Sequence, residues 1–275
     1  MSFQHNNFFN LQEYIQGKAA SRALVPMISS INSRSTHAFL QRHLAGQSDK
    51  IGLHLASGEG AETFFIANIL GENGQVTGIE KDEVMIEKAR HKISESGCGV
   101  QFFPSQHYNW IQKNYCDFVY FPIYPSWLPM KAELIQGIRE CLKPGGKLLI
   151  EIQRLSNFRR YPYNHAFARS VELLGLLEAE YTDFPVNDVK QLSELFQNAG
   201  FRVAEHECIQ PFFIGSQYNN IISLSLEVCS EQIIAFGLSS QVEINALLVE
   251  LKYCETKQDT LISSNGMTQI KVYKK

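Results

Sequence analysis

A short run in the first quarter of the chain has residue types that suit binding of a nucleotide-like ligand. Residues 53–63 read LHLASGEGAET, an apolar run that leads into glycines and then into a helical pattern. A strand-to-helix turn of this kind directs backbone N–H groups into a concave spot, where glycine lets a ligand approach the main chain. We expect the N–H groups of Ser57, Gly58 and Gly60 to surround that spot.

An acidic residue follows the loop at a spacing that suits a ribose contact. Glu80 ends the next strand-like run, 20 residues after Gly60, where a carboxylate can accept both ribose hydroxyls. The alternative is a tight turn with no ligand, and Glu80 makes that alternative weaker. A dinucleotide would need the third glycine of GxGxxG, but Thr63 stands there, so NAD is the less favoured nucleotide.

The elements that must position these residues alternate between two periodicities. Alternating strands and helices predict βαβ units, and therefore an α/β fold with a parallel sheet. Strand patterns occur near 51–56, 75–80, 99–103, 116–121 and 146–152, with helical patterns at 61–70, 82–95 and 131–142. After residue 152 we expect helices at 168–180, 188–199 and 240–254, the last with Ser240 and Glu243 as a capping box, and strands at 201–209 and 267–275.

Composition excludes several classes of function. Lys and Arg together number 25 against 28 Asp and Glu, which gives no basic face for nucleic acid. The six cysteines show no CxxC spacing, so we expect no metal and no disulfide framework. No apolar run reaches the roughly 20 residues of a membrane helix, and the start MSFQHNNFFN is unlike a signal peptide. We therefore expect a cytoplasmic protein without membrane or nucleic-acid partners.

Four motifs in order extend the argument to a family. HLASGEGAET, VTGIEKD, CDFVYFP and ECLKPGGKLLIEI resemble the glycine loop, ribose acid, fourth strand and LKPGG motif of class I S-adenosylmethionine-dependent methyltransferases of the small-molecule type. GFRVAEHE and MTQIKVYKK resemble the closing hairpin of that family. The resemblance implies a three-layer α/β/α fold whose seven-stranded sheet is mostly parallel, with an antiparallel last strand. It divides the chain into a helical cover at 1–45 and a methyltransferase-like domain at 46–275, with helical additions around 155–185 and 210–262.

The resemblance also implies a set of cofactor contacts to S-adenosylmethionine. Three positions depart from the family pattern. His54 stands where an acid usually faces the ammonium group of the cofactor, Ala56 replaces a glycine, and Ser105 replaces an acid that reads the adenine. The full expected set is His54, Ala56, Ser57, Gly58, Gly60, Glu80, Lys81, Ser105, Gln106 and Phe121.

A small organic acceptor is the substrate class that the resemblance implies, and it should bind beyond the carboxyl ends of the strands. The aromatic and basic residues that could line its pocket are Tyr14, Tyr124, Trp127, Arg154, Phe158 and Tyr161. Residues that could act as a base are His107, Tyr124 and His165. The sequence leaves open O- or N-methylation and a monomer or homodimer. A catalytically weak protein that uses the fold to bind a ligand or partner remains the alternative.

Overall fold

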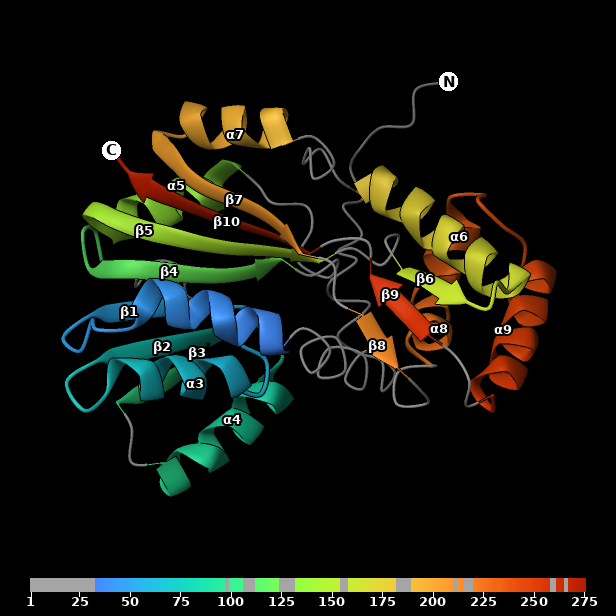
Figure 1. Cartoon of the computed structure of the whole chain (residues 1–275), viewed down its shortest axis with the longest axis horizontal. Helices are drawn as coiled ribbons and strands as arrows, with labels where there is room; N and C mark the ends of the chain where they lie inside the picture. The colour runs from blue at the N-terminus through green and yellow to red at the C-terminus, as the bar shows by residue number, and fades with distance from the viewer. Residues whose placement is uncertain are drawn as a thin grey trace.

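A computed structural model describes residues 33–96, 99–105, 112–123, 132–153, 158–181, 189–209, 212–214, 220–257, 261–264 and 267–275. The main sheet has seven strands in the order β3-β2-β1-β4-β5-β10-β7 (Figure 1). Strands β1 to β5 are parallel, and β10 is antiparallel to both of its neighbours. The predicted topology is confirmed. The strands are β1 Ile51–Leu55, β2 Gln75–Glu80, β3 Val100–Pro104, β4 Cys116–Ile123, β5 Leu142–Gln153, β7 Phe201–Ile209 and β10 Met267–Lys274.

Helices cover both faces of this sheet, as the predicted three layers require. On one face a core forms between the sheet, the helix at 33–44, α3 (Ala61–Leu70) and α4 (Glu83–Ser96). On the other face α5 (Ala132–Cys141) and α7 (Val189–Asn198) pack against the strands. The apolar runs of the central strands are buried on both faces, as expected for a covered parallel sheet.

A second group of elements, which we call the cap, lies beyond the carboxyl ends of β4 and β5 (Figure 1). Its antiparallel sheet has the order β6-β9-β8, which the sequence did not predict. Three helices pack around that sheet and enclose a separate hydrophobic core. The strands are β6 Phe158–Tyr161, β8 Phe212–Ile214 and β9 Leu261–Ser264, and the helices are α6 His165–Tyr181, α8 Ile221–Ala235 and α9 Gln241–Glu255.

The start of α9 shows how the cap helices are joined. Ser240 is the N-cap, and its side chain accepts a hydrogen bond from the backbone N–H of Glu243 at 3.2 Å. The Glu243 carboxylate bonds to Arg169 Nε of α6 at 2.8 Å and to Ser239 Oγ at 2.7 Å. The predicted capping residue is therefore confirmed, while the Glu243 side chain fixes α9 to α6.

Candidate cofactor site

The loop between β1 and α3 makes a tight turn with several residues in the left-handed region. Gly58 has φ 53° and Gly60 has φ 86°, values that favour glycine. A Cβ on Gly60 would lie 2.5 Å from the Phe102 ring, whereas a Cβ on Gly58 would meet nothing within 4 Å. Gly60 is thus required for packing against β3, and Gly58 presents its main chain to open space.

The N–H groups of this loop bond within the protein, which differs from the sequence prediction. Ser57 N donates to the Ile79 carbonyl at 3.0 Å, and Gly60 N donates to the Ser57 carbonyl at 2.9 Å. Gly58 N donates to Glu80 Oε2 at 2.8 Å. These bonds hold the turn against the end of β2. The loop therefore offers a ligand a close approach to its main chain, and its three N–H groups serve to shape the turn.

Glu80 stands at the end of β2 with its carboxylate turned toward the loop. Its side chain is buried, and Oε1 accepts hydrogen bonds from the N–H groups of Lys81 at 2.6 Å and Asp82 at 3.1 Å. Burial raises the pKa of Glu80, and the three backbone donors oppose that effect. A carboxylate oxygen has about two acceptor positions. Among the described residues Oε2 uses one for Gly58 N, which leaves the other for a ligand hydroxyl.

His54 is a neutral residue inside the site. It is 1% exposed, and burial lowers its pKa to about 3, so the imidazole would not repel a cation near neutral pH. Nδ1 lies 2.7 Å from Thr63 Oγ1. The buried Nε2 has no hydrogen-bond partner among the described residues. If Nδ1 carries the proton and donates to Thr63, Nε2 presents a lone pair to a donor.

Ala56 occupies a backbone conformation that favours glycine. Its φ is 56° and its side chain is buried. A left-handed conformation costs an ordinary residue roughly 1–2 kcal/mol. Such strain is concentrated at functional sites, where surrounding structure enforces it. An alanine at this position, where the family usually has a glycine, therefore adds backbone strain to the turn that holds Glu80.

The described residues fit a nucleoside with an amino-acid tail. Buried polar atoms in proteins are nearly always paired, yet His54 Nε2 and Ser57 Oγ both lack a partner within the described part of the chain. Ser57 adjoins Gly58 in the loop, and His54 lies near the end of β1, the strand that leads into the loop. Polar groups of a bound ligand would satisfy these atoms.

The other predicted site residues fall into two groups. Among the described residues, Ser105 is buried after β3, and Phe121 packs into the core on the α5 and α7 face. Phe158 is buried in β6, Tyr161 is 73% exposed on the same strand, and His165 is exposed at the start of α6. Lys81 follows Glu80, with its N–H on that carboxylate. The positions outside the described residues are Tyr14, Gln106, His107, Tyr124, Trp127 and Arg154.

A buried polar group that the sequence analysis missed lies under the same edge of the sheet. Glu151 of β5 is 3% exposed, and its carboxylate accepts hydrogen bonds from the Tyr120 hydroxyl and from Gln269 Nε2, the latter at 2.6 Å. The Thr36 hydroxyl is a further partner, and burial raises the pKa of Glu151 to about 7. The Tyr120 ring lies 4.8 Å from the His54 ring. The only sequence signal was a charge within the apolar run LLIEI.

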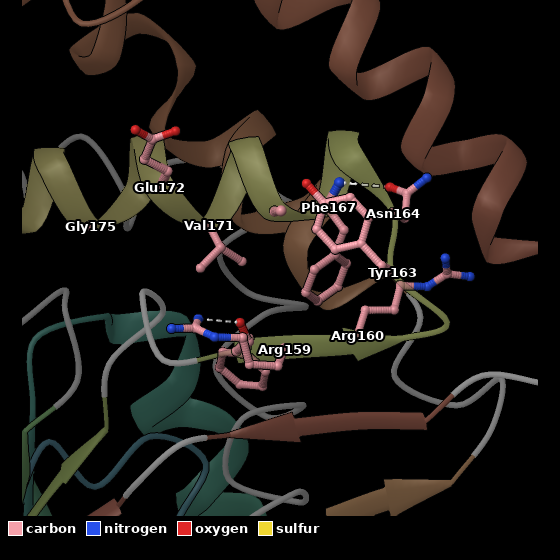
Figure 2. A pocket seen from close by; sticks show the side chains of 10 residues that line it. Arg159, Arg160, Tyr163, Asn164, Phe167, Val171, Glu172 and Gly175 are labelled. Atoms are coloured by element: carbon pink, nitrogen blue, oxygen red, sulfur yellow. Dashed lines mark hydrogen bonds between the residues drawn. The ribbon is translucent and has the colours of Figure 1, made fainter.

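A cavity of about 430 Å³ opens in the cap between α6 and β6. Figure 2 shows Val171 and Phe167 on the side of α6 that faces β6, while the Glu172 carboxylate points away. Phe158 completes an apolar lining, and Arg159 and Arg160 of β6 also line the cavity. Arg160 Nη2 donates to the Cys254 carbonyl of α9 at 3.2 Å. Arg159 Nη1 donates to the Phe158 carbonyl at 2.8 Å. The cavity thus combines an apolar floor with basic groups.

Comparison of the sequence with known families supports the nucleoside site. Residues 53–146 match the family described as Methyltransferase domain. Demethylmenaquinone methyltransferase of Lactococcus lactis subsp. lactis (strain IL1403) is 29% identical over 170 residues, covering 56% of this chain and 67% of that protein.

Within the part of the chain that the structure describes, every helix is too short or too polar to cross a bilayer.

Solved structures share the fold at low identity. One is phosphoethanolamine N-methyltransferase 2 of Haemonchus contortus, solved with phosphomonomethylethanolamine and S-adenosylhomocysteine. Its TM-score is 0.57 at 16% identity, and the match covers 96% of this chain but only 60% of that protein. The YcgJ protein of Bacillus subtilis gives 0.55 at 12% identity, covering 88% of this chain and 99% of the other. The [4+2]-cyclase SpnF gives 0.53 at 16% identity, covering 96% and 94%. The cyclase illustrates that this fold alone does not determine the reaction.

The sequence match and the site geometry point to the same family. The matched residues contain the β1 loop, Glu80 and the LKPGG segment, and the sheet has the expected strand order with its antiparallel β10. The open main chain of Gly58 and the acceptor position on Glu80 suit the adenosine and methionine parts of one ligand. Residues 53–146 carry a match to the methyltransferase-domain family, and the strand order is the one expected for class I S-adenosylmethionine-dependent methyltransferases, which indicates S-adenosylmethionine as the cofactor.

Proposed function

We propose that this protein transfers a methyl group from S-adenosylmethionine to a small organic acceptor that binds at the cap, beyond the carboxyl edge of the main sheet. The observation that carries the proposal is the cap itself, which faces the edge where the cofactor loop ends (Figure 1). Ligands of open α/β sheets bind beyond the carboxyl ends of the strands. An enclosed acceptor also suits a reaction that must exclude water.

The chemistry requires little from the protein beyond positioning. When bound, S-adenosylmethionine supplies an electrophilic methyl group on a cationic sulfur, and the departing thioether needs no proton. The role of this chain is then to align donor and acceptor, which can provide much of the rate. Glu80 would hold a ribose hydroxyl through Oε2, and His54 Nε2 would accept a hydrogen bond from the methionine part.

The cap cavity supports a particular kind of acceptor. Its lining has aromatic and aliphatic groups from Phe158, Phe167 and Val171 beside the guanidinium groups of Arg159 and Arg160. An apolar body with an acidic or otherwise hydrogen-bond-accepting group would match both features. The names of two similar proteins point the same way, since one acts on demethylmenaquinone and the other was solved with a phosphorylated small amine.

The base remains a proposal at three positions. An alkoxide-forming or acidic acceptor would benefit from proton removal by a group within hydrogen-bond reach. His165 is exposed on the cap at the start of α6, so it can reach an acceptor only at the cap side of the interface. His107 and Tyr124 lie outside the described residues. Both O- and N-methylation stay open.

A calorimetric titration tests the cofactor half of the proposal. Wild-type protein should bind S-adenosylhomocysteine, and Glu80→Ala should weaken that binding by about tenfold or more, because hydrogen bonds to charged groups contribute roughly 1.5–3 kcal/mol. Glu87→Ala is the matched control, since Glu87 is an exposed carboxylate on the neighbouring helix α4. Equal affinity of wild type and Glu80→Ala would contradict the assigned role.

A transfer assay tests the acceptor half. Wild-type protein is incubated with methyl-labelled S-adenosylmethionine and a panel of small aromatic acids, phenols and amines. We expect label transfer to at least one class, with Val171→Trp reducing it because an indole would fill the cap cavity. Cofactor binding without transfer to any of these classes would favour the alternative of a ligand-binding protein that uses the same fold.

A further inference from the structure

Glu151 is a buried carboxylate whose position the methyl-transfer chemistry above does not use. It lies near the carboxyl end of β5, in register with Pro122 of β4 and Gln269 of β10. The side chain of Thr36, on the helix at 33–44, forms a hydrogen bond with the Glu151 carboxylate. The Ser35 carbonyl of the same helix accepts a hydrogen bond from Gln269 Nε2 at 3.3 Å. Three elements besides β5 therefore contribute groups to this one carboxylate: β4, β10 and the helix at 33–44.

The groups that hold Glu151 are neutral donors. Tyr120, Gln269 and Thr36 supply hydrogen bonds without a positive charge. Lys271 of the neighbouring strand β10 forms an ion pair with Glu205, and no ion pair joins it to Glu151 among the described residues. The carboxyl group of Glu62 on α3 is close enough to act as a like charge on Glu151. The described groups that hold Glu151 therefore include no Lys or Arg side chain.

A line of contacts connects Glu151 to the cofactor loop. The carboxylate holds the Tyr120 hydroxyl, the Tyr120 ring contacts the ring of His54, and Nδ1 of His54 meets the hydroxyl of Thr63 at the start of α3. Tyr120 and His54 are also paired in the register of β4 and β1. His54 is the last residue but one of β1, the strand that leads into the loop, and it carries no charge near neutral pH.

We propose that Glu151 provides the buried negative charge that makes this site bind the sulfonium form of its cofactor, S-adenosylmethionine, more tightly than the product S-adenosylhomocysteine. Both molecules have the same adenosine and amino-acid groups, and they differ by one methyl group and one positive charge on sulfur. Opposite charges attract strongly in a low-dielectric interior. A neutral His54 leaves this task to a carboxylate deeper in the sheet. The inference rests on the cofactor role of the site described above.

The proposal has a pH signature whose sign follows from the carboxyl group. With a pKa of about 7, Glu151 is largely protonated below neutral pH and ionised above it. The facing groups are Tyr120 on β4, Gln269 on β10, Thr36 on the 33–44 helix, Glu62 on α3 and, through Tyr120, His54 on β1. Preference for the sulfonium ligand should therefore rise as the pH increases through about 7.

The experiment compares two ligands on three proteins by calorimetric titration. Glu151→Gln keeps the shape of the side chain and removes its charge; Glu207→Gln removes an exposed carboxylate of β7 that pairs with Arg42. We expect Glu151→Gln to weaken the binding of S-adenosylmethionine by about tenfold and to change the affinity for S-adenosylhomocysteine by less than about twofold. Glu207→Gln should bind both ligands as wild type does. An equal loss for both ligands, or no loss for either, would overturn the proposal.

A measurement on wild-type protein keeps the test valid if Glu151→Gln does not fold. Titrations at neutral pH in two buffers of different ionisation enthalpy count the protons released on binding. We expect S-adenosylmethionine to release more protons than S-adenosylhomocysteine, and equal release would overturn the proposal. If neither ligand binds wild-type protein, the cofactor assignment fails instead, so the two failures are distinguishable.

Discussion

The strongest stability prediction concerns His54, because its burial makes the fold sensitive to acid. The pKa of this imidazole falls from 6.5 in an unfolded chain to about 3 in the folded protein. The unfolded chain therefore binds a proton that the folded protein rejects, and stability is lost progressively as the pH falls from about 6.5 toward about 3. At about pH 5 the loss from this one residue amounts to about 2 kcal/mol.

Urea unfolding of wild type and His54→Gln at about pH 7.5 and about pH 5 measures this loss. The amide introduced by the substitution would not titrate, and it retains a group that can bond to Thr63 Oγ1. We expect wild type to lose about 2 kcal/mol more than the variant between the two pH values. His165→Gln, at an exposed site in the cap, is the control and should follow wild type. Equal losses in wild type and His54→Gln would refute the buried, neutral imidazole.

Four further substitutions test other parts of the site. Ala56→Gly should change the unfolding free energy by less than about 1 kcal/mol. The substitution relieves left-handed strain of roughly 1–2 kcal/mol, but it also removes a buried methyl group and makes the unfolded chain more flexible. A loss of unfolding free energy above about 2 kcal/mol in urea would contradict this expectation. Gly60→Ala should destabilise more than Gly58→Ala in thermal melts, since only the former meets the Phe102 ring; a reversed order would contradict the assigned packing. Tyr120→Phe should cost about 1–3 kcal/mol by leaving Glu151 with one donor fewer, and an unchanged urea midpoint would argue against that bond.

Much of the main sheet could be predicted because its signals are local. The central strands are rich in apolar residues, and glycine or proline marks many of the turns. The predicted strand at 75–80 and helix at 61–70 agree with β2 and α3 residue for residue. The predicted end of the strand at 116–121 is two residues short of β4, which ends at Ile123. Strand ends lack a distinct local signal, so such differences are expected.

The cap sheet could not be predicted for a physical reason. Strand β8 has 3 residues and β6 and β9 have 4 each, which is too short for alternation to be recognised. Phe158 pairs with Ser264 across more than a hundred intervening residues. Only the tertiary structure brings these segments together. The helices α6 and α9 were predicted because they are long enough to show a stripe of apolar residues.

The site divides in the same way. Glu80 and its loop were found from the sequence because a strand, a turn and a carboxylate follow one another within 30 residues. The group around Glu151 was missed because its members come from β4, β5, β10 and the helix at 33–44. Sequence reasoning also assigned the loop N–H groups to a ligand, whereas the structure uses them to hold Glu80 and the turn. Local motifs locate a site, and long-range contacts set its electrostatics.

The cap is assembled from two excursions of the chain, one between β5 and β7 and the other between β7 and β10. Strands β6 and β9 join these excursions through their pairing. Exchanging the cap for that of a related enzyme, in order to redirect the acceptor, would therefore require both excursions to be grafted together. Grafting only one of the two excursions would leave either β6 or β9 without the strand with which it normally pairs.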